Sequence, residues 1–335
     1  MLKVSAMSSM VSQDLHVAAR FAAECGLDGL DLDRVWEQPI ELVAASGELD
    51  QLQRVLSEQR TQIFCLATSI FRCWLDSAAA FQEHLHQLEA CLRLAETLRA
   101  QDGAPLVRCY AFFRSGKLED HWSRLLERFE AAAGLAARYG LVLGVQNDAQ
   151  TFLGTGREVA RLVETINSEH LKAVWDPCAA VFDVDRPEIP YPDGYRCLRQ
   201  HIVHVVLRDV DRRKFYGSLR EVELGEGLID HRRQVLALMA DGYRGAVSLA
   251  TMWRPGMAWD RSPDMADFTE AGGQRAVRIC LDNLRAMMGA SKTDHSTLKQ
   301  GDDESGLLST DSSERMERKS RVWSISSVQS DLGIR

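Results

Sequence analysis

An alternation that recurs eight times along the chain constrains the fold more than any other feature. Short runs of apolar, often β-branched residues are each followed by a longer run whose apolar residues recur at helical spacing. This pattern is typical of βα units, in which a crossover helix joins two parallel strands. The expected strands span residues 4–7, 29–33, 62–68, 105–112, 141–146, 173–176, 202–208 and 246–250. The expected helices span residues 15–25, 40–58, 78–99, 118–139, 157–166, 193–200, 231–241 and 265–288.

Eight βα units are the number that closes a parallel sheet into a (β/α)8 or TIM barrel, which usually takes about 250 residues. The chain has 335 residues, 45% of them hydrophobic, so it can bury the core of one such domain. Gly26, Gly140 and Gly242 each follow an expected helix, where a residue that tolerates positive φ ends it. The sequence therefore predicts the α/β class and a single (β/α)8 barrel over residues 1–289.

The composition changes after Gly289. Residues 290–335 are dominated by Ser, Thr, Asp, Glu, Lys and Gln, and Trp323 is their only aromatic residue. Because so few apolar side chains cannot offset the entropy of ordering, we expect a disordered tail. Ser320 and Ser324 lie beside basic residues, which suggests a phosphorylation or docking segment for a protein partner. A solvated tail without a defined role is the alternative.

Charge and hydropathy exclude several classes of partner. The formal net charge of -8 argues against a nucleic-acid-binding protein, since such proteins need a clustered basic surface. No apolar run approaches the roughly 20 residues that span a bilayer, and residues 1–14 lack the pattern of a signal peptide. The eight cysteines are scattered without a C-x-x-C pair, which favours reduced, buried thiols. We therefore expect a cytoplasmic protein with neither a nucleic acid nor a membrane as partner.

Four of the expected strands end in short motifs that carry a resemblance. The motifs are Val145-Gln146-Asn147, Trp175-Asp176-Pro177, the six residues from His204 to Asp209, and Ser248-Leu249-Ala250. The chain resembles the xylose isomerase-like TIM barrels, a family of sugar isomerases and epimerases. There the corresponding stretches typically read Val-Glu-Asn, Trp-Asp-Pro, His-x-His-Leu-Lys-Asp and Ser-Leu-Glu. The resemblance covers nearly all of residues 4–288 and implies a divalent-metal site at the strand ends.

The resemblance places the four metal-ligand positions of the family at Gln146, Asp176, Val206 and Ala250. Only Asp176 is an anionic ligand there. Gln146 offers one neutral carbonyl oxygen, and the side chains of Val206 and Ala250 have no atom that can bind a metal ion. Ala179 also stands where the family usually has a polar residue. A hard cation such as Mg²⁺ or Mn²⁺ needs several oxygen ligands. We therefore expect no cofactor and no metal-dependent catalysis.

Three alternatives stay open for this ligand pattern. In the first the strand ends are shifted relative to those of the family, and in the second catalysis proceeds without metal. In the third, Mn²⁺ or Mg²⁺ binds a set rebuilt from Asp148, His204 or Asp209.

The candidate residues of the pocket are those that the barrel would bring to the carboxyl ends of its strands, where the βα loops of a TIM barrel converge. They are Asp31, Gln146, Asp176, His204, Arg208 and Arg212.

Several of these residues have a purely structural interpretation as well. His204 lies deeper than the lost ligand position, which favours a hydrogen-bonded core histidine. Arg208 replaces the family's Lys, and it either pairs with Asp176 or Asp209 or meets an anionic ligand. Arg212 begins the basic run Arg212-Arg213-Lys214, which either reaches over the open end of the barrel toward an anionic ligand or is a solvated loop.

Aromatic residues near the expected strand ends suggest a wall for stacking against a carbohydrate, although packing in the core is the alternative. They are Trp36, Phe112, Phe113 and Trp175.

The function expected from the resemblance is that of a family member without metal-dependent isomerisation, which retains a pocket for a sugar, polyol or sugar acid. An active metal-dependent isomerase or epimerase is the first alternative. An interaction protein that acts through its C-terminal tail is the second.

Overall fold

The computed structural model describes residues 2–47, 49–100, 103–183, 185–212, 219–257 and 268–289. The expected disordered tail at residues 290–335 lies outside the described residues, as do Arg213 and Lys214 of the basic run. Within the described residues, no helix is both long and apolar enough to cross a bilayer.

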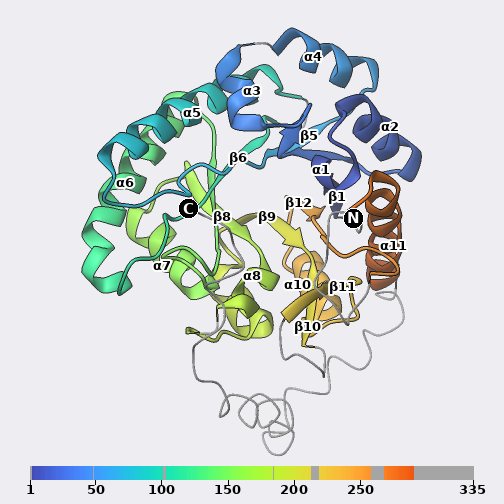
Figure 1. Ribbon diagram of the computed structural model, residues 1–335. Coiled ribbons are helices and arrows are strands. Elements are labelled where there is room, and N and C mark those ends of the chain that lie inside the picture. Colours follow the sequence, from blue (N-terminus) through green and yellow to red (C-terminus); the bar gives the residue numbers. More distant parts are fainter. Residues whose placement is uncertain are drawn as a thin grey trace, which may run out of the picture. The chain divides into compact units, whose positions relative to one another are not determined.

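Eight parallel strands close into a barrel, which confirms the predicted fold class (Figure 1). Each strand pairs with its neighbours in the order β1-β12-β9-β8-β7-β6-β5-β2. The strands are β1 (Lys3–Met7), β2 (Gly29–Leu32), β5 (Ile63–Leu66), β6 (Leu106–Cys109), β7 (Leu143–Gln146), β8 (Leu171–Trp175), β9 (Ile202–Leu207) and β12 (Ala246–Leu249).

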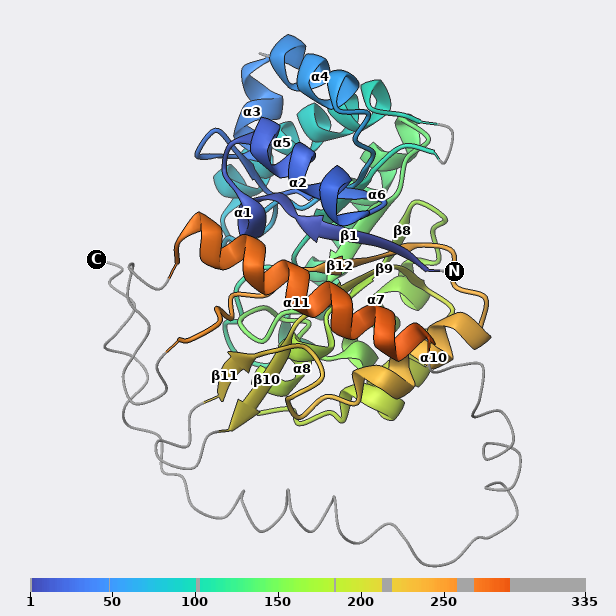
Figure 2. The same cartoon turned by 90° about the vertical axis from the view of Figure 1, so that its right-hand side faces the viewer.

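Helices surround the barrel, and Figure 2 shows α11 running along its outside beside β1 and α1. The longer helices are α2 (Leu15–Cys25), α3 (Ile40–Ser46), α4 (Leu49–Glu58), α5 (Ala78–Thr97), α6 (Leu118–Arg138), α7 (Gly156–Ile166), α10 (His231–Ala240) and α11 (Glu270–Gly289). The helix expected over 40–58 is broken, because Gly47 ends α3 with a φ of 76°. The helix expected over 193–200 is reduced to a turn at Pro190–Gly194 and to α9 (Tyr195–Leu198). Two short helices that the sequence did not indicate are α1 (Ser8–Val11) and α8 (Pro177–Phe182).

Two hairpins follow barrel strands and were not expected. One pairs β3 (Arg34–Val35) with β4 (Gln38–Pro39), and the other pairs β10 (Asp209–Arg212) with β11 (Leu219–Val222). The first turns through Trp36 and Glu37, whose φ angles of 50° and 64° are those that a two-residue hairpin requires. Asn or Gly usually occupies such positions, so the sequence carried no turn signal there.

Strand alternation separates two kinds of side chain along β9. Val205 and Leu207 point outward into the large apolar layer between barrel and helices, whereas Val206 points inward. Gly144 lets the lumen close tightly, since a Cβ atom there would lie 2.6 Å from Val174 Cγ2. The lumen is therefore packed with side chains, as is usual for an eight-stranded barrel.

An aromatic cluster fills the outer layer beside α5 and α6. The rings of Phe71 and Phe112 stack with centroids 5.0 Å apart, and Phe129 packs edge-on against both. Phe71, Phe112 and Phe129 have no exposed surface. This cluster ties the loop after β5 to the end of β6.

We predict that Phe129→Ala lowers the free energy of unfolding by about 3 to 5 kcal/mol, because the truncation leaves a cavity against two fixed rings. Urea denaturation monitored by circular dichroism measures the change. Leu42→Ala is the control, since Leu42 is 46% exposed and its loss should cost no more than about 0.5 kcal/mol. Equal losses in the two variants would contradict the assigned packing.

Candidate functional site

Polar side chains from four neighbouring strands meet at the carboxyl end of the barrel. Arg108 comes from β6, Gln146 ends β7, and Asp176 and Arg208 directly follow β8 and β9. Glu221 joins them from β11 in the hairpin that follows β9. We call these five residues the mouth cluster.

The mouth cluster is held by a chain of hydrogen bonds. Arg108 Nη1 donates to Gln146 Oε1 at 3.1 Å, and Gln146 Nε2 donates to Asp176 Oδ2 at 3.2 Å. The amide thus presents its oxygen to a guanidinium group and its nitrogen to a carboxylate. A neutral side chain with both a donor and an acceptor suits this position, where a second carboxylate would face Asp176.

Arg208 joins the two carboxylates of the cluster. Its Nε and Nη2 donate to Asp176 Oδ2 at 3.0 and 2.8 Å, and its Nη1 donates to Glu221 Oε1 at 3.0 Å. Burial alone would lower the pKa of Arg208, but the adjacent Asp176, Cys178 and Glu221 outweigh it and raise the pKa. Arg208 therefore stays charged at every relevant pH.

Asp176 is fixed on all sides. Its side chain has no exposed surface, and its Oδ1 accepts a hydrogen bond from the N–H of Ala179 at 3.0 Å, which caps α8. Asn147 accepts from the N–H of Asp176 and donates to its carbonyl oxygen, both at 2.8 Å. Both carboxylate oxygens of Asp176 are consequently engaged by protein donors.

Val206 and Ala250 lie in a small apolar cluster inside the barrel, together with Val174. Met7 and Leu106 pack against this cluster. The two positions at which the family would place a histidine and a glutamate thus contribute packing to the lumen.

His204 and Asp31 do not belong to the mouth cluster. His204 Nε2 lies 2.7 Å from Asp31 Oδ2, and Ser5 Oγ donates to Asp31 Oδ1 at 3.0 Å. His204 lies two residues before Val206 on the inward face of β9, and so deeper in the barrel. His204 is a buried, hydrogen-bonded histidine.

The other candidates lie apart as well. Arg212 is half-buried at the end of β10, and the hydrogen bonds of the mouth cluster do not include it. Asp148 pairs with Arg72, and Asp209 accepts from the N–H groups of Gly225 and Gly227 at 3.0 Å. Asp148, Asp209 and His204 therefore do not meet at one point, because Asp148 and Asp209 have separate partners and His204 lies beside Asp31.

Of the two interpretations of the aromatic residues near the strand ends, packing in the core describes Trp175 and Phe112. Trp175 points outward, where its Nε1 donates to Gln234 of α10 at 3.1 Å, and Phe112 belongs to the aromatic cluster. Strand alternation turns the last residue of β8 away from the lumen, so Trp175 cannot form a stacking wall at the mouth. Trp36 instead lines a groove of 550 Å³ beside α1 and the start of α11, with Arg254 and Glu270 among its other residues. No residue of the mouth cluster lines this groove.

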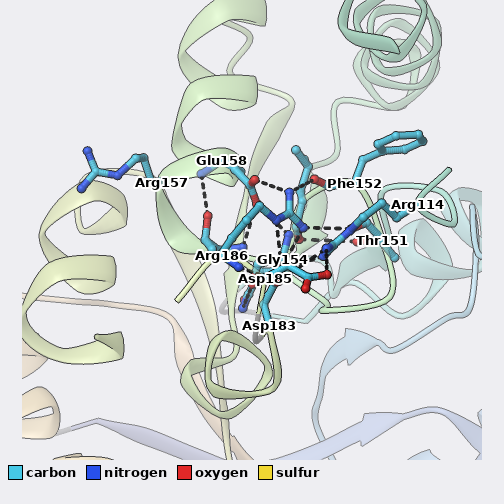
Figure 3. A network of polar contacts seen from close by, with 12 residues as sticks. Arg114, Thr151, Phe152, Gly154, Arg157, Glu158, Asp183, Asp185 and Arg186 are labelled. Atoms are coloured by element: carbon cyan, nitrogen blue, oxygen red, sulfur yellow. Dashed lines mark hydrogen bonds and ion pairs between the residues drawn. The ribbon is translucent and has the colours of Figure 1, made fainter. Parts of the chain in front are cut away.

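A second polar network fixes the loops around the mouth (Figure 3). Asp183, which follows α8, accepts from Arg114 Nη2 at 2.6 Å and from Arg186 Nη2 at 2.7 Å. Arg186 also pairs with Glu158 at the start of α7. A Cβ atom at Gly154 would lie 1.8 Å from Asp183 Oδ2, so glycine is required there. The loops after β6, β7 and β8 thus form one interlocked unit.

Arg108 and Glu221 are the residues that sequence reasoning missed. A signal for Arg108 existed, because a charged residue inside the apolar strand β6 must point into the lumen by alternation. Glu221 carried no such signal, since it lies on a hairpin that only the fold reveals.

A family model described as the xylose isomerase-like TIM barrel matches residues 19–282 of the chain. No curated protein matches the sequence of this chain. Solved structures of several proteins share the fold.

D-Psicose 3-epimerase from Clostridium cellulolyticum H10, solved with D-tagatose, is 14% identical with a TM-score of 0.60 over 86% of this chain and 99% of that chain. D-Allulose 3-epimerase from a Methylomonas species, in complex with D-allulose, is 14% identical with a TM-score of 0.63 over 85% and 97%. A xylose isomerase-like TIM barrel protein from Mycobacterium smegmatis, in complex with magnesium, is 14% identical with a TM-score of 0.56 over 80% and 89%.

We predict that Asp183→Ala lowers the free energy of unfolding by about 3 kcal/mol or more, because it leaves the guanidinium groups of Arg114 and Arg186 without their shared carboxylate. Urea denaturation measures the change. The control is Asp185→Ala, which removes a carboxylate that is 75% exposed and 3.4 Å from the same Arg114. It should cost less than about 1 kcal/mol, and a comparable loss would contradict the central role of Asp183.

Proposed function

The chain belongs to the xylose isomerase-like TIM barrel family, and we propose that its mouth cluster binds a neutral sugar or polyol without a divalent cation. The observation that carries this proposal is the position of Arg208. Its guanidinium group donates two hydrogen bonds to Asp176, the one carboxylate left among the expected metal ligands. A fixed cationic side chain thereby takes the place that a metal ion would have beside Asp176.

The residues present do not fit a divalent metal ion at this position. A hard cation needs several oxygen ligands, preferably charged. Asp176 already accepts from Arg208, Gln146 and Ala179, and Val206 and Ala250 offer no donor atom. The guanidinium groups of Arg108, which is buried, and of Arg208, which is half-buried, would also repel a cation.

The charges of the mouth cluster favour a neutral ligand. Arg108 and Arg208 carry two positive charges, and Asp176 and Glu221 carry two negative charges, so the cluster is formally neutral. An anionic sugar acid would have to compete with Glu221 for Arg208. A sugar or polyol can instead exchange hydrogen bonds with Arg208 and Glu221 while these remain paired. Relatives of the same fold include structures solved with D-tagatose and with D-allulose, which supports this class of ligand.

Isomerisation or epimerisation is not part of the proposal, because it requires a group that removes a proton. Gln146 cannot act as a base near neutral pH. Both carboxylate oxygens of Asp176 already accept hydrogen bonds, and those of Glu221 accept from Arg208 and from the N–H group of Met252. We therefore propose a binding role, as in a sensor or a partner subunit. The alternative of a protein that acts through residues 290–335 has no support from the described residues.

We predict that the chelator-treated protein binds D-tagatose, D-allulose or myo-inositol in calorimetric titrations, and that D-glucuronate binds more weakly. Glu221→Gln should reverse this preference, since it frees one edge of Arg208 and leaves the cluster with a net positive charge. We expect the affinity for D-glucuronate to rise by about tenfold, which corresponds to about 1.4 kcal/mol.

Two controls locate the binding site. Trp36→Ala alters the separate groove and should leave these affinities unchanged. Titration with Mn²⁺ tests whether the mouth cluster binds a divalent cation, and Asp176→Asn is the matched variant. The proposal fails if none of the neutral compounds binds, if Trp36→Ala abolishes their binding, or if Mn²⁺ binds in a manner that Asp176→Asn removes.

A further inference from the structure

Three potential metal ligands converge inside the barrel, below the mouth cluster. Asp31 comes from β2, Cys65 from β5 and His204 from β9. One ligand atom of each lies within 4.8 Å of the other two, and none of the three side chains is more than 2% exposed. The three strands are far apart in the sequence, so only the closed barrel brings these groups together.

We propose that Asp31, Cys65 and His204 bind one divalent cation of the zinc type in the interior of the barrel. One carboxylate, one thiolate and one imidazole form a mixed donor set that suits zinc and does not suit magnesium or calcium. This site is distinct from the strand-end positions of Gln146, Asp176, Val206 and Ala250, and it does not depend on the function proposed for the mouth cluster.

The geometry needs only small movements. Neighbouring ligands of a tetrahedral zinc ion lie roughly 3.3 to 3.5 Å apart, for Zn–O and Zn–N distances near 2.0 Å and Zn–S near 2.3 Å. The distance between His204 Nε2 and Asp31 Oδ2 is 2.7 Å, so this pair would open slightly. Cys65, whose sulfur lies within 4.8 Å of both, would approach. Side-chain rotations of this size leave the strands in place.

Binding of a zinc-type cation requires the Cys65 thiol to lose its proton, which is the cost of this site. Burial raises the pKa of the Cys65 thiol, and Asp31 raises it further, so the thiol holds its proton in the metal-free protein. Binding of the cation displaces that proton and forms the Zn–S bond. The resulting thiolate and the Asp31 carboxylate then neutralise the two positive charges of the ion, and His204 binds as a neutral imidazole.

An independent observation concerns the hydroxyl group of Ser248. This residue has no exposed surface, faces the lumen from β12 and pairs laterally with Ser5 and Val206. Its Oγ has no hydrogen-bond partner within the described part of the protein. Strand β12 lies between β9, which carries His204, and β1, which carries Ser5. This buried hydroxyl group can exchange a hydrogen bond with a water molecule that completes the coordination of the metal.

The experiment uses the full chain without a polyhistidine tag, expressed with zinc in the medium. Elemental analysis of the purified protein should find about one zinc ion per chain. After denaturation in chelator and refolding with Co²⁺, the absorption spectrum should contain a thiolate-to-cobalt charge-transfer band, because one ligand is a cysteine.

Variants assign the site. Cys65→Ser should abolish the charge-transfer band and weaken binding of Zn²⁺ by at least tenfold, while circular dichroism remains that of the native fold. Cys109→Ser is the matched control, since Cys109 is equally buried but points outward from β6, and it should retain the band. Asp176→Asn should also retain it, because that residue belongs to the mouth cluster.

Three results would overturn the proposal. The first is a native protein that contains no zinc and gives no thiolate band with Co²⁺, a measurement that needs no variant to fold. The second is a band that survives Cys65→Ser. The third is a loss of zinc caused by Asp176→Asn alone.

Discussion

The ion pair between Arg208 and Asp176 determines what the end of this barrel can do. A carboxylate without solvent contact is costly unless charge and hydrogen bonds compensate it. Here the compensation comes from Arg208, the Gln146 amide and the capped N-terminus of α8. The neighbouring elements fit this pair, since Glu221 holds the other edge of the guanidinium group and thereby attaches the β10–β11 hairpin to the barrel.

Hydrophobic periodicity was enough to predict the fold, because each barrel strand is short, apolar and followed by an amphipathic helix. It also placed Gln146, Asp176 and Arg208 at one end of the barrel, since parallel strands present their carboxyl ends together. Their mutual hydrogen bonds depend on distances between strands that no sequence pattern contains. Asp31 was grouped with the mouth by its position near a strand end, whereas its partner His204 lies deeper in the barrel.

The elements that escaped prediction have few local signals. The β3–β4 hairpin turns through Trp36 and Glu37 rather than through glycine or asparagine, and α8 is only Pro177–Phe182. Trp175 was assigned to the mouth although its neighbour Asp176 faces inward, and adjacent residues of a strand face opposite sides. For Trp175 a tertiary contact, the hydrogen bond to Gln234, fixes the outward orientation.

The orientation of the Gln146 amide limits which substitutions this end of the barrel accepts. Its oxygen accepts a hydrogen bond from the Arg108 guanidinium group and its nitrogen donates one to the Asp176 carboxylate, so one neutral side chain satisfies both a cation and an anion. Replacing Gln146 by glutamate would place a second carboxylate beside Asp176, and the two negative charges would repel each other while Arg208 remains paired with Asp176. Adding a histidine at Val206 alone would force a polar ring among aliphatic groups. Either substitution alone would therefore disturb contacts that the present side chains satisfy, and a metal-binding arrangement at these positions would require several coordinated changes.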